Sequence, residues 1–384
     1  RAGSQSGSST NGHESGPELG ELHFFSSRWV ARLRILAHDN CRFSSHHITH
    51  ATSISVRPAP TNTIFFATNT PPLIARVESM TIALIATGGT IACTAAADGS
   101  LIPTVTGQEL ARSLSADIEV IEFRQLDSSS ITLADLDELL GTVHVQLTRT
   151  DIDGILITHG TDSMEETAMA LSIFDPGTKP VVLTGAQRSF DHPGGDGPRN
   201  LHDSLHLIEQ GTPGVYIQFG GMTIPARGAR KNHTFHLNGF ESMPVGESNL
   251  FPLPLAPLAP HPVAILAAYP GADATLVDAA IPHFSGLVIE ALGSGNMGEG
   301  MGEGVARALE AGLPVAISTR VPYGTTSLAY GGSGGGATLA DKGAVSAGAF
   351  RPGQARILLA AALATGTPVS EVFAAKAAPK QYSR

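Results

Sequence analysis

Four short stretches rich in hydroxyl groups and glycine each follow an apolar run of the chain. They are residues 87–92 (TGGTIA), 127–130 (DSSS), 159–163 (HGTDS) and 184–188 (TGAQR). A threonine hydroxyl is a weak nucleophile until a base or a fixed hydrogen-bond relay takes its proton, and a partly desolvated lysine can be that base. Backbone N–H groups at a glycine turn can stabilise the oxyanion that forms when a carbonyl group is attacked. These residue types therefore suit attack on a carbonyl compound by a hydroxyl group.

Each stretch also has an ordinary structural explanation. The hydroxyl of Thr90 could bond the local backbone, Asp162 could cap the helix that follows it, and Lys231 could be a solvated surface charge. The glycine pair of the first stretch fits neither common phosphate-loop pattern, so it does not predict a phosphate site. What favours a functional site is that all four stretches occupy the same kind of position, directly after a predicted strand.

The segments between these loops alternate between predicted strands and helices. Apolar runs predict strands at residues 81–86, 118–126, 154–158, 180–183 and 214–219, and helices are predicted at about 106–114, 132–147, 163–174 and 199–209. A capping box begins at Thr106, Thr132 opens the second of these helices, and Glu165 and Glu166 lie in a first helical turn, where the dipole favours acids. The order predicts an α/β fold whose mostly parallel sheet is covered by helices on both faces. The four loops should then meet at the carboxyl edge of the sheet, where such folds bind ligands.

Changes in composition divide the chain. Residues 80–240 are the predicted N-terminal catalytic domain. Residues 241–262 contain six prolines, cannot continue a helix or a central strand, and predict an extended linker. Residues 263–384 predict a smaller C-terminal α/β domain, with strands at 263–268, 286–289 and 315–318 and helices at 273–281, 301–311, 354–363 and 370–375. Residues 1–79 show no sustained apolar period and predict a disordered extension.

The composition of the 384-residue chain excludes several classes of protein. The formal net charge of −10 gives nucleic-acid binding no electrostatic support, and no apolar run is long enough to predict a membrane span. The two cysteines, Cys41 and Cys93, cannot form a disulfide framework and suit a reducing compartment, which predicts a cytoplasmic location. Since His46, His47 and His50 lack further ligands, we predict neither a metal nor a cofactor.

Five motifs resemble those of the bacterial-type L-asparaginase family. They are ATGGTIA (residues 86–92), ITHGTDSMEETA (157–168), PVVLTGAQR (180–188), DGPRNL (196–201) and RVPYG (320–324). The first two look like the two signatures of the family and are highly specific. The resemblance covers residues 80–384, and at the second-domain contacts it is closer to the cytoplasmic class.

The resemblance implies hydrolysis of the side-chain amide of L-asparagine to L-aspartate and ammonia. Thr90 matches the family's threonine nucleophile, which acts through an acyl-enzyme type of intermediate. Thr161, Asp162 and Lys231 match the accompanying catalytic group. The family resemblance also implies self-association to a homodimer or homotetramer, with the active site closed by a neighbouring chain.

The resemblance also implies a set of substrate contacts. Ser128 matches the serine that holds the α-carboxylate of the amino acid, and Ser129 occupies the next contact. Asp162 should bind the α-ammonium group, beside Thr161. Ala186 should contact the scissile amide through its backbone.

The chain departs from the family pattern at two places. The family's loop tyrosine is missing from residues 91–110. Either Thr104 takes its place, or the hydrogen-bond relay to the nucleophile is built differently. The glutamate expected after RVPYG is replaced by Tyr330 or Gly331. Two alternative functions stay open: an amidotransferase component that supplies ammonia for tRNA-dependent amidation, and a non-catalytic amino-acid-binding protein.

Overall fold

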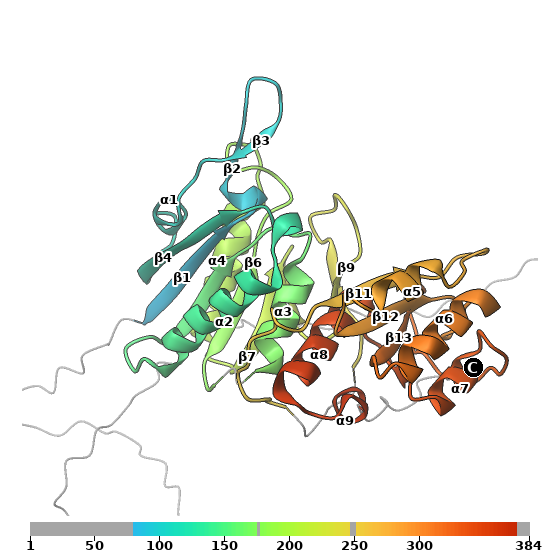
Figure 1. Ribbon diagram of the computed structural model, residues 1–384. Helices are drawn as coiled ribbons and strands as arrows, with labels where there is room; N and C mark the ends of the chain where they lie inside the picture. The colour runs from blue at the N-terminus through green and yellow to red at the C-terminus, as the bar shows by residue number, and fades with distance from the viewer. Residues whose placement is uncertain (1–79, 175–176, 246–250, 375–384) are drawn as a thin grey trace, which may run out of the picture. The chain divides into compact units, whose positions relative to one another are not determined.

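The computed structural model describes residues 80–174, 177–245 and 251–374 (Figure 1). The extension predicted for residues 1–79, including Cys41 and the three histidines at 46, 47 and 50, lies outside the described residues. Within the described ranges, none of the helices combines the length and apolar character needed to cross a bilayer.

The first domain is built on a six-stranded sheet. Its strand order is β4 (Asp117–Leu126), β1 (Thr81–Gly88), β5 (Gly154–Thr158), β6 (Pro180–Thr184), β7 (Gly214–Phe219) and β8 (Met222–Pro225). All pairs are parallel except β7 and β8, which form an antiparallel hairpin. The five parallel strands confirm the prediction. β8 was not predicted, because four residues are too few to show a period.

Helices cover both faces of this sheet, as predicted. Alternate residues of β1 point to opposite faces, so Ile82 packs with α1 (Gly107–Ala111) and α4 (Gly197–Glu209), while Ala83 packs with α2 (Leu133–Thr148) and α3 (Met164–Ile173). The predicted capping box at Thr106 is present, and Thr132, where a helix start was predicted, forms a second one with Asp135. α4 begins two residues earlier than predicted, because Pro198 is well suited to the first turn of a helix.

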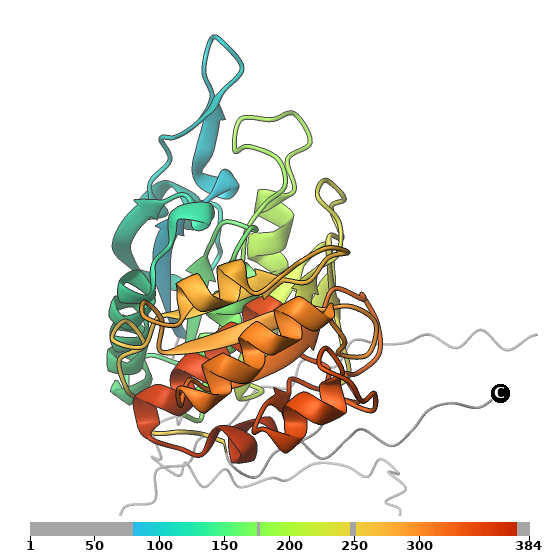
Figure 2. The same ribbon diagram turned by 45° about the vertical axis from the view of Figure 1, so that its right-hand side comes forward.

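The second domain contains a smaller, fully parallel sheet. Its order is β11 (Val263–Ala267), β12 (Gly286–Ala291), β13 (Val315–Thr319) and β14 (Val345–Ser346). Its helices are α5 (Thr275–Ala280), α6 (Glu299–Glu310), α7 (Gly336–Asp341), α8 (Pro352–Thr365) and α9 (Val369–Phe373). The two short elements β14 and α7 were not predicted. Figure 2 shows the helices lying against this sheet.

The two domains share a core. α8 lies beside α3, and apolar side chains of both helices belong to one buried cluster (Figure 1). Part of the segment predicted as an extended linker, residues 241–262, packs against this core. Leu253 and Leu258 are buried in that same cluster, and the carboxylate of Asp137 on α2 accepts the backbone N–H groups of Leu258 and Ala259, at 2.6 and 2.9 Å. The leucines between the prolines therefore attach this segment to the first domain.

Candidate active site

The four hydroxyl-rich loops lie next to one another at the carboxyl edge of the first sheet. They follow β4, β1, β5 and β6, which are consecutive neighbours in the strand order. The predicted convergence is therefore confirmed, because the ends of adjacent parallel strands lie about 5 Å apart.

Two glycines allow the loops after β1 and β5 to touch. Gly89 has a φ of 81°, and a Cβ atom built on it would lie 2.4 Å from the backbone nitrogen of Gly160. Only glycine fits such a contact without displacing the neighbouring backbone. Thr90, the first residue of the 3₁₀ helix η1 (Thr90–Ala92), and Thr161 each come directly after one of these glycines. The glycine contact thus brings the two predicted catalytic threonines onto adjoining backbone.

Ser128 joins a third loop to the same place. It begins the 3₁₀ helix η2 (Ser128–Ser130), and its buried hydroxyl accepts the backbone N–H of Asp162 at 3.2 Å. Its carbonyl accepts the hydroxyl of Ser163 at 2.6 Å. Ser129 is exposed beside it, and its backbone N–H donates to the capping carboxylate of Asp127 at 3.1 Å. Ser128 is therefore bonded to the 161–163 loop, and Ser129 follows it in the same 3₁₀ helix.

Lys231 reaches this edge from β9 (Ala229–Lys231). Its Nζ donates hydrogen bonds of 2.8 Å to Thr161 Oγ1 and 2.8 Å to Asp162 Oδ1. The lysine side chain is 19% exposed, whereas that of Asp162 is 60% exposed. Lys231 follows Thr161 and Asp162 by about 70 positions in the sequence, and the structure brings the three residues together. They form one hydrogen-bonded group with a carboxylate open to solvent.

Ala186 lies in a loop that is fixed from below by α4. The Asp196 carboxylate accepts the backbone N–H groups of Gln187 and Arg188, at 2.9 and 3.0 Å. Asn200 donates to the carbonyl of Gly185 at 2.9 Å. Ala186 itself is buried. The residues 196–201 thus act as a support for the loop that the prediction assigned to the scissile amide.

His159 supports the loop that carries Thr161. Its ring is fully buried, with Nδ1 2.7 Å from the Gly160 carbonyl oxygen and Nε2 2.9 Å from Thr167 Oγ1. Burial lowers the pKa of His159 to about 4, so the ring is neutral at pH 7. A neutral ring can donate from Nδ1 to the carbonyl and accept the Thr167 hydroxyl at Nε2. The sequence offered no sign of this role.

Glu165 is a second residue that the sequence did not connect to the site. Its carboxylate accepts the backbone N–H of Lys231. Burial, together with the charge of Glu166, raises the pKa of Glu165 to about 7, although the Lys231 N–H and the charges of Arg230 and Lys231 oppose the rise. Its position in a first helical turn indicated only a favourable dipole.

The residue suggested as a substitute for the missing tyrosine has a partner of its own. β2 (Cys93–Ala95) and β3 (Leu101–Pro103) form an antiparallel hairpin that projects from the sheet edge (Figure 1). The hydroxyls of Thr94 and Thr104 lie 2.8 Å apart at its base. Tyr330, one of the two residues suggested in place of the missing glutamate, is exposed.

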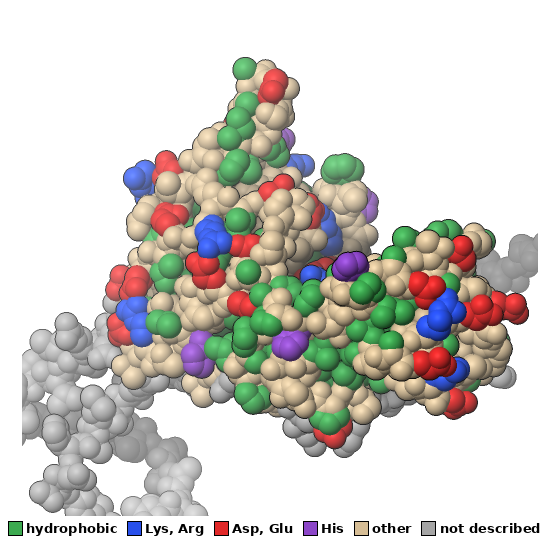
Figure 3. Space-filling model, viewed as in Figure 1, with side chains coloured by type: hydrophobic (Ala, Val, Ile, Leu, Met, Phe, Trp, Pro, Cys, Tyr) green, Lys and Arg blue, Asp and Glu red, His purple; other side chains and the backbone are tan. Residues whose placement is uncertain are grey.

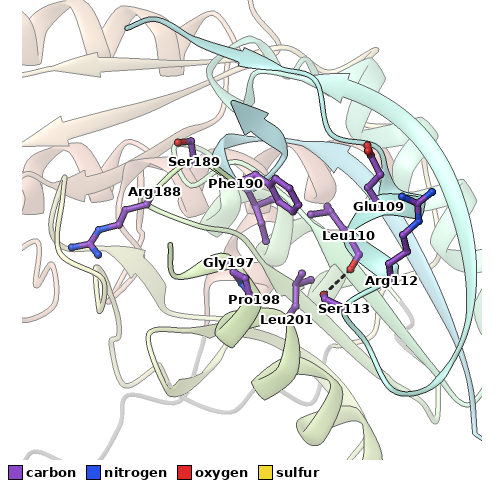
Figure 4. A pocket seen from close by; sticks show the side chains of 11 residues that line it. Glu109, Leu110, Arg112, Ser113, Arg188, Ser189, Phe190, Gly197, Pro198 and Leu201 are labelled. Carbon is purple, nitrogen blue, oxygen red and sulfur yellow. Dashed lines mark hydrogen bonds between the residues drawn. The ribbon is translucent and has the colours of Figure 1, made fainter. Parts of the chain in front are cut away.

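A separate cavity of about 360 Å³ lies behind the Thr90 turn (Figure 4). Its wall is mainly apolar and includes Ile91, Leu110, Phe190 and Leu201. None of the predicted catalytic or binding side chains lines it, so it is not where the site places its substrate. In the described part of the chain, no group of three His, Cys, Asp or Glu side chains is arranged to hold a metal ion.

The fold and the strand-end group together define a two-domain amidohydrolase of the asparaginase type. The profile described as "Asparaginase, N-terminal" matches residues 81–251, and that described as "Glutaminase/Asparaginase C-terminal domain" matches residues 262–374. The chain belongs to the asparaginase family.

Individual relatives agree with this assignment. The chain is 32% identical to a protein named "Probable L-asparaginase" from Deinococcus radiodurans, over 76% of this chain and 95% of that protein. It is 28% identical to a glutamyl-tRNA(Gln) amidotransferase chain of Methanosphaera stadtmanae, over 76% of this chain and 74% of that protein. A solved structure described as a probable cytoplasmic L-asparaginase from Campylobacter jejuni matches with a TM-score of 0.68 and 26% identity. That match covers 77% of this chain and 99% of the other.

Proposed function

We propose that the protein hydrolyses the side-chain amide of L-asparagine to L-aspartate and ammonia. The observation that carries the proposal is the hydrogen-bonded group of Lys231, Thr161 and Asp162, held against the Thr90 turn by the contact between Gly89 and Gly160. The L-asparaginase names of the relatives support the same reaction.

The proposed reaction has two halves. The Thr90 hydroxyl attacks the side-chain carbonyl carbon, and its proton passes through Thr161 to the amine of Lys231. The C–N bond breaks, and the departing nitrogen takes up the proton and leaves as ammonia. A water molecule then attacks the resulting ester, which releases aspartate and restores the hydroxyl. The backbone at Ala186 contacts the scissile amide in this scheme.

The same loops supply groups for the amino-acid end of the substrate. The Ser128 hydroxyl oxygen accepts from Asp162 N, so its own O–H can donate to the substrate α-carboxylate. Asp162 binds Lys231 through Oδ1, and its exposed carboxylate retains capacity for the α-ammonium group. Ser129, exposed beside Ser128, supplies the adjacent contact.

The test is simultaneous measurement of ammonia and aspartate released from L-asparagine by the purified protein, without tRNA. Equal amounts of both products are expected. Ammonia release that requires a charged tRNA would favour the amidotransferase alternative, which the Methanosphaera stadtmanae relative keeps open. Binding of asparagine with no product would favour a non-catalytic binding protein.

We further propose that the protein is a cytoplasmic homodimer or homotetramer. The exposed aromatic side chains Tyr269, Tyr323 and Tyr330 of the second domain support self-association, as do the hydrophobic side chains gathered over that domain in Figure 3. The Campylobacter jejuni relative supports the location. Light scattering at several protein concentrations tests the assembly, and a fully active monomer would contradict it.

We also propose that the domains comprise residues 80–240 and 263–384, joined by residues 241–262. The first family profile ends at residue 251, inside the joining segment, and the second begins at residue 262, so the profiles support a domain boundary within this segment.

A further inference from the structure

The backbone of Lys231 is held by a residue from a distant part of the first domain. Lys231 is the last residue of β9, a three-residue strand paired with β10 (Phe240–Ser242). Its N–H donates to the carboxylate of Glu165, the second residue of α3, which lies 66 positions earlier in the chain. β9 is only three residues long, so this bond adds to its pairing with β10 in fixing where the lysine side chain starts.

The cationic side chains near Glu165 are each bonded to a group other than its carboxylate. Arg230 on β9 pairs with Glu241 on β10, with Nε 2.6 Å from Oε1, and its guanidinium lies over the Tyr323 ring. Arg356 on α8 lies 3.4 Å from the carboxylate of Glu166. The Nζ of Lys231 is bonded to Thr161 and Asp162.

The second domain also reaches this point through an uncharged side chain. Gln354 on α8 is buried and donates from Nε2 to the carbonyls of Glu165 and Ala226, at 3.1 and 2.8 Å. Its Oε1 accepts the N–H of Gly228 at 2.9 Å. Gln354 therefore links the first turn of α3 to the turn that precedes β9. The hydrogen bond between Glu165 and Lys231 joins that same turn of α3 to the end of β9.

We propose that Glu165 is the positioning residue for Lys231: its carboxylate fixes the end of β9 so that Nζ reaches Thr161 and Asp162. The inference rests on the proposed role of Lys231 in amide hydrolysis. Since a charged acceptor makes a stronger hydrogen bond than a neutral one, ionisation of Glu165 strengthens this restraint. The pKa of about 7 then places that change near neutrality, so kcat should rise in a one-proton step between about pH 6 and 8.

The test compares the full-length wild type with Glu165→Gln, Glu165→Met, Glu166→Gln and Lys231→Met. Glu165→Gln keeps a neutral acceptor of the same shape, so it should retain KM within about threefold and lose the step near pH 7. Glu165→Met removes the acceptor and should lower kcat about tenfold or more, with KM little changed. Glu166→Gln is the matched control, because Glu166 is the neighbouring carboxylate and does not bond Lys231. It should keep the step, moved to a lower pH because the charge of Glu166 no longer raises the pKa of Glu165.

Two results would overturn the proposal: a pH step that survives in Glu165→Gln, or an unchanged kcat in Glu165→Met. Thermal unfolding of each variant shows whether it is folded, and if Glu165→Met is not, the pH profile of the near-isosteric Glu165→Gln decides. Retention of activity by Lys231→Met would instead contradict the proposed catalytic group. The failure of that proposal is therefore distinguishable from failure of this one.

Discussion

The two parallel sheets of the molecule differ at their carboxyl edges. In the first sheet, the strand ends carry Thr90, Ser128 and Thr161, on loops that touch through glycine. In the second sheet, the two hydroxyl groups at the end of β13 are bonded to the protein's own backbone. Ser318 donates to the Phe350 carbonyl at 2.8 Å, and Thr319 to the Gly293 carbonyl at 2.6 Å.

The comparison separates what topology provides from what the residues add. Both sheets bring loops together at one edge, because parallel strands end on the same side. In the first sheet, a lysine from outside the parallel strands meets those loops and leaves a carboxylate open to solvent. An active site at such an edge therefore needs hydroxyl groups at the strand ends that are not already bonded to backbone carbonyls.

The largest effect is expected at Thr161. Thr161→Val removes the hydroxyl that accepts from Lys231, and should lower kcat at least about a hundredfold while leaving the melting temperature nearly unchanged. The matched variant Thr319→Val, in the second sheet, should do the reverse: it loses about 1 kcal/mol of stability and less than threefold in activity. Steady-state kinetics and thermal unfolding of both variants check this pair. Equal losses of activity would erase the distinction between the two edges.

The next largest effect is expected at His159, on the pH dependence of the free energy of unfolding. The pKa of His159 is lowered to about 4 by burial, against 6.5 in an unfolded chain, so between these values only the unfolded state takes up the proton. Above pH 6.5 the free energy of unfolding includes the full contribution of His159. As the pH falls towards 4, the free energy of unfolding decreases by about 3 kcal/mol because of this residue. In urea unfolding from pH 7 to pH 4, His159→Gln should show a flatter decline than the wild type.

A smaller effect is expected on substrate binding. Ser128→Ala should raise KM for asparagine about tenfold or more, because a hydroxyl hydrogen bond to a charged carboxylate is lost, and should change kcat less. Ser318→Ala in the second sheet should leave KM unchanged, since that hydroxyl is bonded to Phe350. If both variants show the same KM, Ser128 has no part in holding the substrate.

The smallest effect belongs to the surface of the second domain. Arg307 and Asp278 form an ion pair of 2.7 Å in which both side chains are nearly half exposed. Exposed pairs of this kind are screened by solvent, so Asp278→Asn should keep activity within about twofold and shift the melting temperature less than any other variant here. A large loss of activity would show that the second domain contributes more to the site than its contacts indicate.

The sequence predicted the elements whose signals are local. Apolar runs located the parallel strands, and the capping box at Thr106 and the threonine at 132 located two helix starts. Pairings between distant segments left no local signal. Examples are the bond from Lys231 to Glu165 and the attachment of residues 253–258 to α2 and the shared core.

The same division between local signals and distant contacts applies to the active site. The family resemblance identified Thr161, Asp162 and Lys231, and the structure places these three in contact. The residues that support them, His159 and Glu165, act through burial and through contacts with other segments. Neither effect can be read from residue type and spacing alone.

The most direct test of the account is mass spectrometry of the protein quenched in acid during asparagine turnover. The account predicts an adduct with the mass of asparagine less ammonia, on the peptide that contains Thr90, and no adduct in Thr90→Ala. It also predicts that Thr90→Ala retains less than about a tenth of wild-type turnover. An adduct on the peptide that contains Thr161, or full turnover by Thr90→Ala, would contradict the account.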